Sequence, residues 1–353
     1  MKDVFELSAT AVTNVKGGTQ LAGYTLQPVK WLKEIIGAAK VSHFHAQFAK
    51  QGMVDINQTS MVFPYQKEYK PSGDFEDTVA ENTTITWTTL DTVDGVEAAP
   101  ADQNAGIKIS ERALRTNALD LVREAREQLT YYAGDKVDLA VRDALVASTN
   151  QAATATRGAY TVYGGDARAD SELAAGDVIT PDMVVDAKVN LTSSVLKYWV
   201  PGTPAAEAIS SVTANTWKAT SNEPFVLIIA PEQSRAFLKD SQFMNASEYG
   251  GNEILMEGEI GKYVGCKVIE TSNTKSFTAA GTAADGGGVA GATGHRCVLF
   301  KALKAMGLAW GSKPRLRVFD YTSDLSKRMV MDLAYAAVAI QKDAICNIDV
   351  ADV

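Results

Sequence analysis

The chain has 353 residues, a formal net charge of -8 and a sequence pI near 5.1. This length allows one large or two medium domains with a sizeable core. An acidic balance argues against a protein whose main task is to bind phosphate backbones. No apolar run approaches the roughly 18 residues of a membrane span, so we expect a soluble, cytosolic product with no membrane partner.

The cysteines predict no cross-links. There are three, Cys266, Cys297 and Cys346, and they are widely spaced with no C-x-x-C pair. An odd number with this spacing indicates neither a disulfide framework nor a zinc ribbon. We expect them to be small buried hydrophobic side chains.

Basic residues gather in two parts of the chain. Residues 1–50 carry six lysines against three acidic residues, and residues 301–328 carry seven basic residues against two acidic ones. We interpret both stretches as solvated faces or inter-subunit ion pairs rather than as direct nucleic-acid contacts.

The N-terminal region combines an arm with a predicted helix. Residues 1–27 are typical of an extended arm, which buries little by itself and usually binds another subunit. Residues 28–51 place apolar side chains from Trp31 to Phe48 near helical spacing, and Gly52 follows as a stop signal. We therefore expect an amphipathic helix over 28–51 that docks on the rest of the chain.

A polar, β-rich excursion occupies residues 54–104. The segments SMVFPYQKEY and TTITWTTLDTV alternate as strands do, and the turn-prone KPSGDFED separates them. Their aromatic residues have no helix nearby in the sequence to cover them. An ordinary sheet within the core is the alternative, but the following DGVEAAPADQNAG resembles a flexible return, which favours a protruding hairpin.

Residues 107–149 form the most informative stretch, a short strand GIKIS followed by a helix of about ten turns. Ser110 is the expected N-cap, and Glu111 lies in the first turn, where the positive helix end favours a carboxylate. A narrow apolar stripe follows at helical spacing: Leu114, Ala118, Leu121, Ala125, Leu129 and Tyr132. The flanking i,i+4 pairs are Glu111/Arg115, Arg123/Glu127 and Asp138/Arg142. This pattern predicts a strut; a coiled coil is the weaker alternative, because Gly134 interrupts the pattern.

The rest of the chain predicts an α+β domain. YTVY is a short strand, Pro181 starts a helix capped by Thr180, PFVLIIAP is a buried strand, PEQSRAFLKD is a short helix and YVGCKVIET is a further strand. Residues 276–294 predict an exposed loop, since they lack the Gly-Lys-Ser/Thr step of a phosphate-binding loop. The segments CVLFKALKAMGLAW, RLRVFDYT and RMVMDLAYAAVAIQKDAICNIDV predict the closing strands.

No catalytic motif is present. His43 and His45 lie two apart on a predicted helix, so they point to different faces, and His295 follows the Gly-rich segment. Clustered carboxylates such as Glu253, Glu257 and Glu259 are candidates for an acid/base or metal-binding set. We interpret it as structural, and we expect no enzyme activity, no cofactor and no metal.

Two of these segments resemble the major capsid proteins of tailed bacteriophages. KISERALRTNALDLVREAREQL resembles their spine helix, and PFVLIIAPEQSRAFLKDSQFMNASEYGGNEILMEGEIGKYVGCKVIET resembles their central segment. The resemblance covers most of residues 28–353 in order. It implies the Hong Kong ninety-seven type of fold: α+β, with an N-terminal arm, an extended β-hairpin called the E-loop, a peripheral domain with a long spine helix, and an axial domain.

The resemblance also implies a domain division and a function. The ranges are 1–53 for the N-terminal arm and helix, 54–106 for the E-loop, 107–175 for the peripheral domain with the spine helix, 176–325 for the axial domain and 326–353 for C-terminal strands that return to the peripheral domain. Members of the family form pentamers and hexamers of an icosahedral shell around double-stranded DNA. The implied location is the virion capsid, assembled in the host cytoplasm.

Implied contact residues follow from the same resemblance. They are Lys67, Glu68, Tyr69, Lys70 and Trp87 in the E-loop, with Arg315 and Arg317 as inter-subunit ion-pair candidates. Some relatives form Lys to Asn isopeptide links, for which Lys67 or Lys70 and Asn347 have the residue types.

Expected partners are other copies of this chain, a separate scaffolding protein, a portal protein, a decoration protein in some cases, and DNA held by weak non-specific contact. An encapsulin, which encloses cargo protein in the same kind of shell, is the first alternative. A metal-dependent α/β enzyme is the second.

Overall fold

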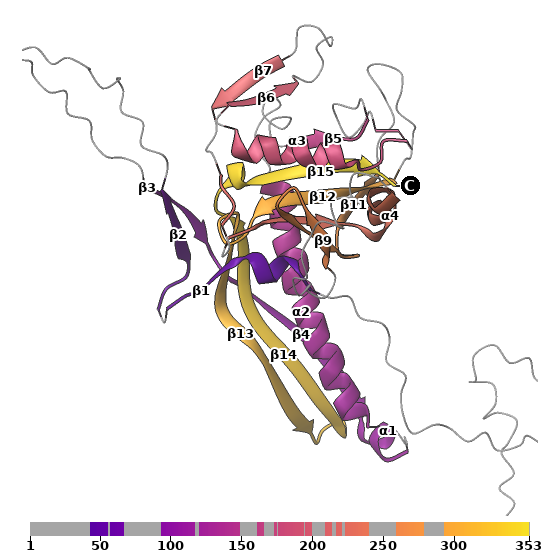
Figure 1. The fold of residues 1–353 in the computed structure, drawn as a ribbon. Coiled ribbons are helices and arrows are strands. Elements are labelled where there is room, and N and C mark those ends of the chain that lie inside the picture. Colours follow the sequence, from indigo (N-terminus) through magenta and orange to yellow (C-terminus); the bar gives the residue numbers. More distant parts are fainter. Residues whose placement is uncertain are drawn as a thin grey trace, which may run out of the picture.

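The structure is a computed structural model of the chain (Figure 1). The residues that it describes are 43–55, 57–66, 93–116, 120–148, 161–165, 173–174, 176–193, 195–199, 209–213, 217–220, 223–239, 259–278 and 293–352. Strands dominate over helices among them, and the architecture is α+β, as the sequence predicted.

A four-stranded sheet forms the elongated part of the molecule (Figure 1). In sheet order its strands are β1 (Lys50–Met53), β13 (Met306–Tyr321), β14 (Ser326–Ala339) and β4 (Ala101–Ser110). β1 pairs in parallel with only the first part of β13, over residues 307–310. β14 pairs antiparallel with both β13 and β4, so these three strands extend well beyond β1.

The predicted strut is present as α1 (Glu111–Thr116) and α2 (Leu121–Ser148). Ser110 caps it, because its hydroxyl accepts a hydrogen bond from the Ala113 N–H at 3.3 Å. Residue Ala118 lies outside the described residues. Ala125 and Leu129 of the predicted stripe are buried, but Tyr132 is exposed. The buried stripe instead continues through Ala133, Val137, Val141 and Leu145.

Two of the three predicted i,i+4 pairs of the strut are confirmed. Arg115 lies 3.6 Å from Glu111, and Arg123 lies 3.0 Å from Glu127. The Asp138/Arg142 pair is wrong: Arg142 binds Asp143 at 2.8 Å, and the Asp138 side chain points into the interior.

α2 continues through Gly134, so the predicted interruption does not occur. A Cβ at this position would lie 3.1 Å from the imidazole Cε1 of His43. The glycine therefore lets the N-terminal segment approach the helix backbone closely.

A second, seven-stranded sheet adjoins the first. Its main path runs β5 (Thr161–Tyr163), β15 (Ile345–Ala351), β12 (Thr293–Lys301), β8 (Phe225–Ile229), β10 (Cys266–Glu270) and β9 (Glu259–Tyr263), with β11 (Lys275–Thr278) paired to β12. The helix α3 (Pro181–Thr192) covers one face of it, and α4 (Pro231–Lys239) follows β8. A separate two-stranded sheet joins β6 (Val195–Trp199) and β7 (Ile209–Thr213).

Several elements of this second sheet were predicted correctly. All five residues of β8 are buried, as a continuous apolar run requires. Thr180 caps α3 by accepting a hydrogen bond from the Met183 N–H, and Pro181 occupies the first turn. The three cysteines are buried and unpaired, and burial raises the pKa of Cys266 to about 11 and those of Cys297 and Cys346 to about 12.

The prediction of a helix over residues 28–51 is wrong for its C-terminal part, residues 43–51. Residues 1–42 lie outside the described residues; beyond them, the chain forms only a short 3₁₀ helix (His45–Phe48) and then β1. Gly52 lies inside β1 instead of ending a helix. Pairing with β13 outweighs the local helical spacing of this stretch.

The hairpin base is present as β2 (Met61–Gln66) and β3 (Val93–Ala98), which pair antiparallel. Residues 67–92, and with them most of the predicted second strand, lie outside the described residues. The expectation of a flexible return over DGVEAAPADQNAG is wrong. Residues 94–98 belong to β3 and residues 101–106 to β4, because β2 and β14 supply hydrogen-bonding partners that local sequence does not reveal.

The predicted domain boundaries stay a prediction. The boundary at residue 325 falls in the turn between β13 and β14, which share one sheet. Of the C-terminal strands, β14 lies in the four-stranded sheet and β15 in the seven-stranded one.

The turn between β9 and β10 provides a test of backbone strain. Val264 and Gly265 have φ angles of 50° and 74°, the left-handed values of a type I′ turn. A β-branched residue is unfavourable there, whereas asparagine is preferred. Val264→Asn should therefore raise the free energy of unfolding by about 1 kcal/mol, measured by urea denaturation. Gly265→Ala should lower it, and stabilisation by that change would contradict the assigned turn.

Candidate assembly surfaces

The base of the β2–β3 hairpin is fixed to the four-stranded sheet by Phe63. Its side chain is 1% exposed and packs with Ala98, Ala309 and Ile340. A Cβ on Gly307 would lie 2.8 Å from the Phe63 ring, so only glycine leaves room for the ring against β13. Gly307 and Ala309 alternate along β13 with Met306 and Leu308, which belong to the core under α2. The hairpin thus covers the face of the sheet opposite to α2.

The predicted E-loop contacts stay predictions. Lys67, Glu68, Tyr69, Lys70 and Trp87 all lie outside the described residues. The two ends of this segment are nevertheless defined, since Gln66 and Val93 are partners in the last pair of the β2–β3 ladder. Figure 1 shows this hairpin base beside β1, at the margin of the molecule.

The same face of the sheet continues beyond the hairpin base, along the distal parts of β13, β14 and β4. We call this region the helix-distal face. The strand registers place these residues on it: Asn104, Gly106, Lys108, Arg315, Arg317, Phe319, Tyr321, Arg328, Val330 and Asp332. All of them are exposed or partly exposed, whereas Ile109, Met329 and Met331 on the opposite face are buried against α2. No described element covers the helix-distal face.

Arg315 and Arg317 lie on this face, and both bind Asp332 of the same chain. The distances from their Nη2 atoms to Oδ2 are 3.0 and 3.1 Å. The arginine side chains remain 59% and 53% exposed. One carboxylate therefore faces two guanidinium groups, which leaves a positive excess. Their role as inter-subunit ion pairs stays a prediction.

Asp324 fixes the end of the β13–β14 hairpin. It accepts hydrogen bonds from Lys108, Ser326 and Arg328, and these bonds hold the pKa of its carboxyl far below the usual range. Arg328 also stacks over the Tyr321 ring, with its Cζ 4.0 Å from the ring centroid. Next to Asp324, Leu325 has a φ of 44° and is 60% exposed. The distal end of the sheet is thus ordered by ionic contacts while it presents apolar side chains.

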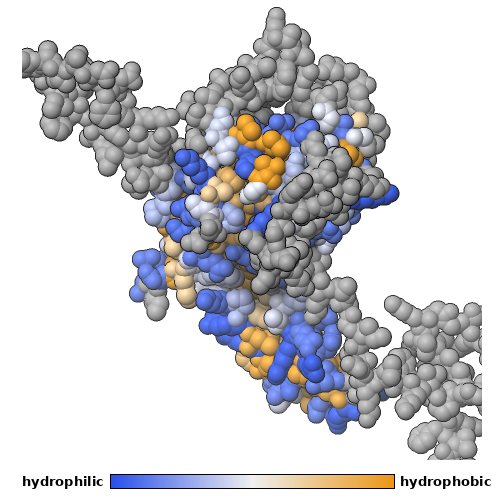
Figure 2. Space-filling model, in the orientation of Figure 1, coloured by the Kyte–Doolittle hydropathy of each residue, from blue (hydrophilic) through white to orange (hydrophobic). Residues whose placement is uncertain are grey.

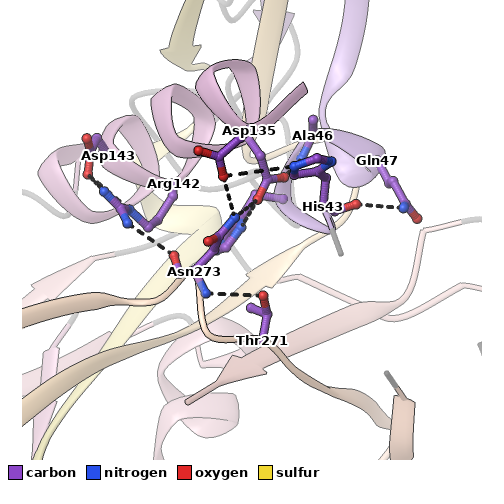
Figure 3. A network of polar contacts seen from close by, with 10 residues as sticks. His43, Ala46, Gln47, Asp135, Arg142, Asp143, Thr271 and Asn273 are labelled. Atoms are coloured by element: carbon purple, nitrogen blue, oxygen red, sulfur yellow. Dashed lines mark hydrogen bonds and ion pairs between the residues drawn. The ribbon is translucent and has the colours of Figure 1, made fainter. Parts of the chain in front are cut away.

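A polar junction joins the N-terminal segment, α2 and the turn between β10 and β11 (Figure 3). Asp138 is fully buried. Its carboxylate accepts hydrogen bonds from the Ala46 N–H at 3.0 Å and from Asn273 Nδ2 at 3.3 Å. Its Oδ2 also lies 3.0 Å from His45 Nδ1. Asn273 also donates to Asp135 at 3.3 Å, and His43 Nε2 lies 3.9 Å from the same carboxylate. Burial alone would raise the pKa of Asp138, but these contacts, mainly that with His45, lower it overall.

The two histidines contact different carboxylates, Asp138 for His45 and Asp135 for His43, and only His45 lies in a helix, the short 3₁₀ helix. No group of three or more potential ligands that could hold a metal ion occurs among the described residues. Glu253 and Glu257 lie outside these residues, and Glu259 begins β9. His295 binds Asp352, with 2.6 Å between Nδ1 and Oδ1.

Asn347 does not suit the hypothesis of an isopeptide link. Its side chain is 1% exposed, and its Nδ2 donates to the Val146 carbonyl at 3.3 Å at the end of α2. A lysine from another subunit has no access to this amide. The sequence supplied the residue type but not its burial.

Within the described residues, no helix has both the length and the apolar character needed to cross a membrane.

Comparison with known proteins identifies the fold. No protein-family model and no curated protein matches the chain. Among solved structures, the capsid of Ralstonia phage GP4 is 13% identical, with a TM-score of 0.64 over 95% of this chain and 98% of that chain. The capsid of cyanophage P-SCSP1u is 13% identical, with a TM-score of 0.64 over 99% of both chains. The capsid of the native GTA particle is 15% identical, with a TM-score of 0.60 over 93% of this chain and 96% of that chain.

These similarities, at low sequence identity, define the class of fold as that of capsid structural proteins. More particularly, the chain has the tailed-phage major capsid fold, which confirms the resemblance drawn from the spine helix and the central segment.

Phe63 allows a test of how the hairpin base is anchored. Phe63→Ala removes a fully packed ring and leaves a cavity against Gly307, so the free energy of unfolding should fall by about 3 kcal/mol or more. Denaturant unfolding followed by fluorescence measures this change. Val62→Ala, on the exposed side of the same strand, is the control and should change stability by less than about 0.5 kcal/mol. Equal effects of the two changes would contradict the anchor.

Asp138 allows a test of the polar junction. Asp138→Asn removes the buried charge that faces His45, so stability at pH 7 should fall by about 3 kcal/mol. Because the folded-state pKa of Asp138 is lowered, its contribution is present above about pH 4 and is lost as pH falls further. The variant should therefore lose less stability than the wild type between about pH 5 and about pH 3, measured by urea denaturation.

Asp135→Asn is the matched control on the same helix. Asp135 is partly exposed and its contacts are longer, at 3.3 and 3.9 Å. Its replacement should lower stability by less than about 1 kcal/mol. A loss as large as that of Asp138→Asn would show that the junction does not depend on the buried carboxylate.

Proposed function

We propose that the chain is a major capsid protein that assembles into pentamers and hexamers of an icosahedral shell enclosing double-stranded DNA. The observation that carries this proposal is the end-to-end likeness to capsid structures, which spans 95 to 99% of this chain for the first two neighbours and nearly all of theirs. The proposed role is structural, in the virion capsid, with assembly in the host cytoplasm.

The hairpin base supports a role in subunit contacts. Residues 67–92 leave and re-enter the body at paired positions on a base that Phe63 fixes to the sheet. A loop on a rigid base adds contact area between subunits without enlarging the monomer core. We assign Lys67, Glu68, Tyr69, Lys70 and Trp87 to contacts of this loop with a neighbouring copy.

The charge balance is consistent with DNA as cargo. A net charge of -8 disfavours tight binding of the chain to phosphates. The proposed contact with packaged DNA is therefore weak and non-specific. A separate scaffolding protein, a portal protein and, in some cases, a decoration protein complete the proposed set of partners.

Negative-stain electron microscopy of the purified protein, alone and after co-expression with its neighbouring genes, tests the proposal. We expect closed shells, rings or sheets of capsomers, because repeated weak contacts close a shell cooperatively. Nuclease-resistant DNA inside particles made with the neighbouring genes would support a viral capsid. A protein cargo in place of DNA would favour the encapsulin alternative. A monomer under every condition, including with a candidate scaffold, would contradict both.

A further inference from the structure

Residues 43–53 form a strap that contacts α2 and both sheets (Figure 3). At its start, the His43 ring lies against the backbone of Gly134 in α2. Further along, the Phe48 carbonyl accepts a hydrogen bond from the Leu303 N–H in the turn between β12 and β13, and β1 then pairs with β13. Three exposed polar residues lie on the strap: Gln47, Lys50 and Gln51. They belong to a surface that mixes hydrophilic and hydrophobic residues (Figure 2).

The two halves of the strap are held by different interactions. Residues 50–53 are held by the backbone ladder between β1 and β13. The N-terminal half, residues 43–48, is held by burial of Phe44 and by two contacts with one carboxylate. His45 Nδ1 lies 3.0 Å from one oxygen of Asp138, and the Ala46 N–H donates to the other oxygen at 3.0 Å. Because backbone amides do not titrate, a single proton on this carboxylate weakens the N-terminal half and spares the ladder.

Three elements supply the groups that face Asp138. The strap supplies His45, with His43 two residues earlier, and α2 supplies Asp135 one turn away. The turn between β10 and β11 supplies Asn273, whose Nδ2 lies 3.3 Å from an oxygen of each carboxylate and does not titrate. Two carboxylates therefore share one amide, and each has a histidine from the strap on its other side.

The other cations near this junction are used elsewhere. Arg142 and Lys275 lie 2.8 and 3.3 Å from Asp143, and Lys136 lies over the Tyr132 ring. Arg142 also donates to the backbone carbonyl of Asn273 at 3.3 Å, on the side away from the shared amide. Within the described part of the chain, a histidine of the strap is thus the cationic group that contacts the buried carboxylate.

This arrangement makes the N-terminal half sensitive to acid. Burial raises the pKa of Asp138, but its contacts with His45, Ala46 and Asn273 together lower that pKa below the ordinary value. The contribution of the carboxylate to the closed strap is therefore present above about pH 4 and is lost as pH falls further. A histidine in water carries a proton at such pH, so a closed strap would then hold a charged ring, 1% exposed, beside a neutral carboxyl. A buried charge without a partner is costly, and lifting the strap returns the ring to water.

We propose that the strap is released by acid: protonation of Asp138 lifts residues 43–48 off α2 while β1 stays paired with β13. The release takes Phe44 out of the core but leaves the contacts between α2 and the two sheets in place. It separates the N-terminal segment from α2 and from the turn between β10 and β11. The device depends on the fold of one chain, so it operates whether or not the chain forms shells.

Hydrogen–deuterium exchange of the purified full chain, followed by mass spectrometry from about pH 6 to about pH 3, tests the proposal. Exchange rates are divided by those of an unstructured peptide at the same pH, which gives a protection factor. Protection of residues 44–49 should fall at least about tenfold between about pH 5 and about pH 3, while that of β8 stays constant. Unchanged protection of the strap would overturn the proposal. A joint loss in the strap and β8 would also overturn it, because the whole chain would then unfold together.

Two matched variants identify the group responsible. His45→Asn places an amide nitrogen about where Nδ1 lies, so it keeps a donor toward Asp138 without a charge. The loss of strap protection in acid should shrink to less than about threefold, because no buried charge is then left unpaired. His43→Asn makes the same change where the side chain is 26% exposed and 3.9 Å from Asp135, and it should keep the full loss. Equal responses of the two variants would contradict the assignment.

Asp138→Asn removes the titrating group itself. Its strap protection should be low already at about pH 6 and should not change between about pH 5 and about pH 3. An acid response as large as that of the wild type would overturn the proposal. If this variant does not fold, the comparison of His45→Asn with His43→Asn still decides the outcome.

Discussion

The packing of α2 against two sheets is the constraint on which the rest of the structure depends. The helix presents one narrow buried stripe, and Val141 and Leu145 of this stripe are completely buried. One core joins them to Met329 and Met331 of the four-stranded sheet and to Ile228 and Phe300 of the seven-stranded sheet. Because interiors are close-packed, neither sheet can move along the helix without opening a cavity. The position of the hairpin base and of the helix-distal face follows from this arrangement.

Burial also explains which polar groups are used for structure and which remain available for contacts. Asp138 and Asn347 are enclosed and satisfy backbone or side-chain donors and acceptors within the chain. Arg315 and Arg317 bind a carboxylate but keep more than half of their side-chain surface in water. A buried polar group is costly to leave unpaired, whereas an exposed ion pair exchanges partners at little cost. The residues predicted as inter-subunit ion pairs therefore lie among exposed pairs.

Elements with a strong local signal were predictable from the sequence. Thr180 and Pro181 predicted the start of α3, and Ser110 predicted the start of the strut. The continuous apolar run of β8 predicted a buried strand. The signal was insufficient where pairing between distant residues decides the structure. β3 and β4 contain Gly, Asp, Asn and Ala, which are poor strand formers, yet β2 and β14 hold them in ladders.

The candidate surface was predictable only in part, for a similar reason. Arg315 and Arg317 stood out because basic residues are dense in that part of the sequence. Their common partner Asp332 and the aromatic neighbours depend on the register of β13 with β14, including two shifts near Ser312. A register shift of one residue reverses the face on which a side chain lies, so no count of charges along the chain could have placed them together.

The junction at Asp138 has a mechanical consequence. The N-terminal segment enters the described body at His43, beside Gly134, and two residues later His45 contacts the buried carboxylate of Asp138 on the helix. The same carboxylate accepts a hydrogen bond from Asn273, which lies in the turn between β10 and β11 of the seven-stranded sheet. A pull on the N-terminal segment would therefore load a helix and both sheets at one point, near the middle of the longest rigid element.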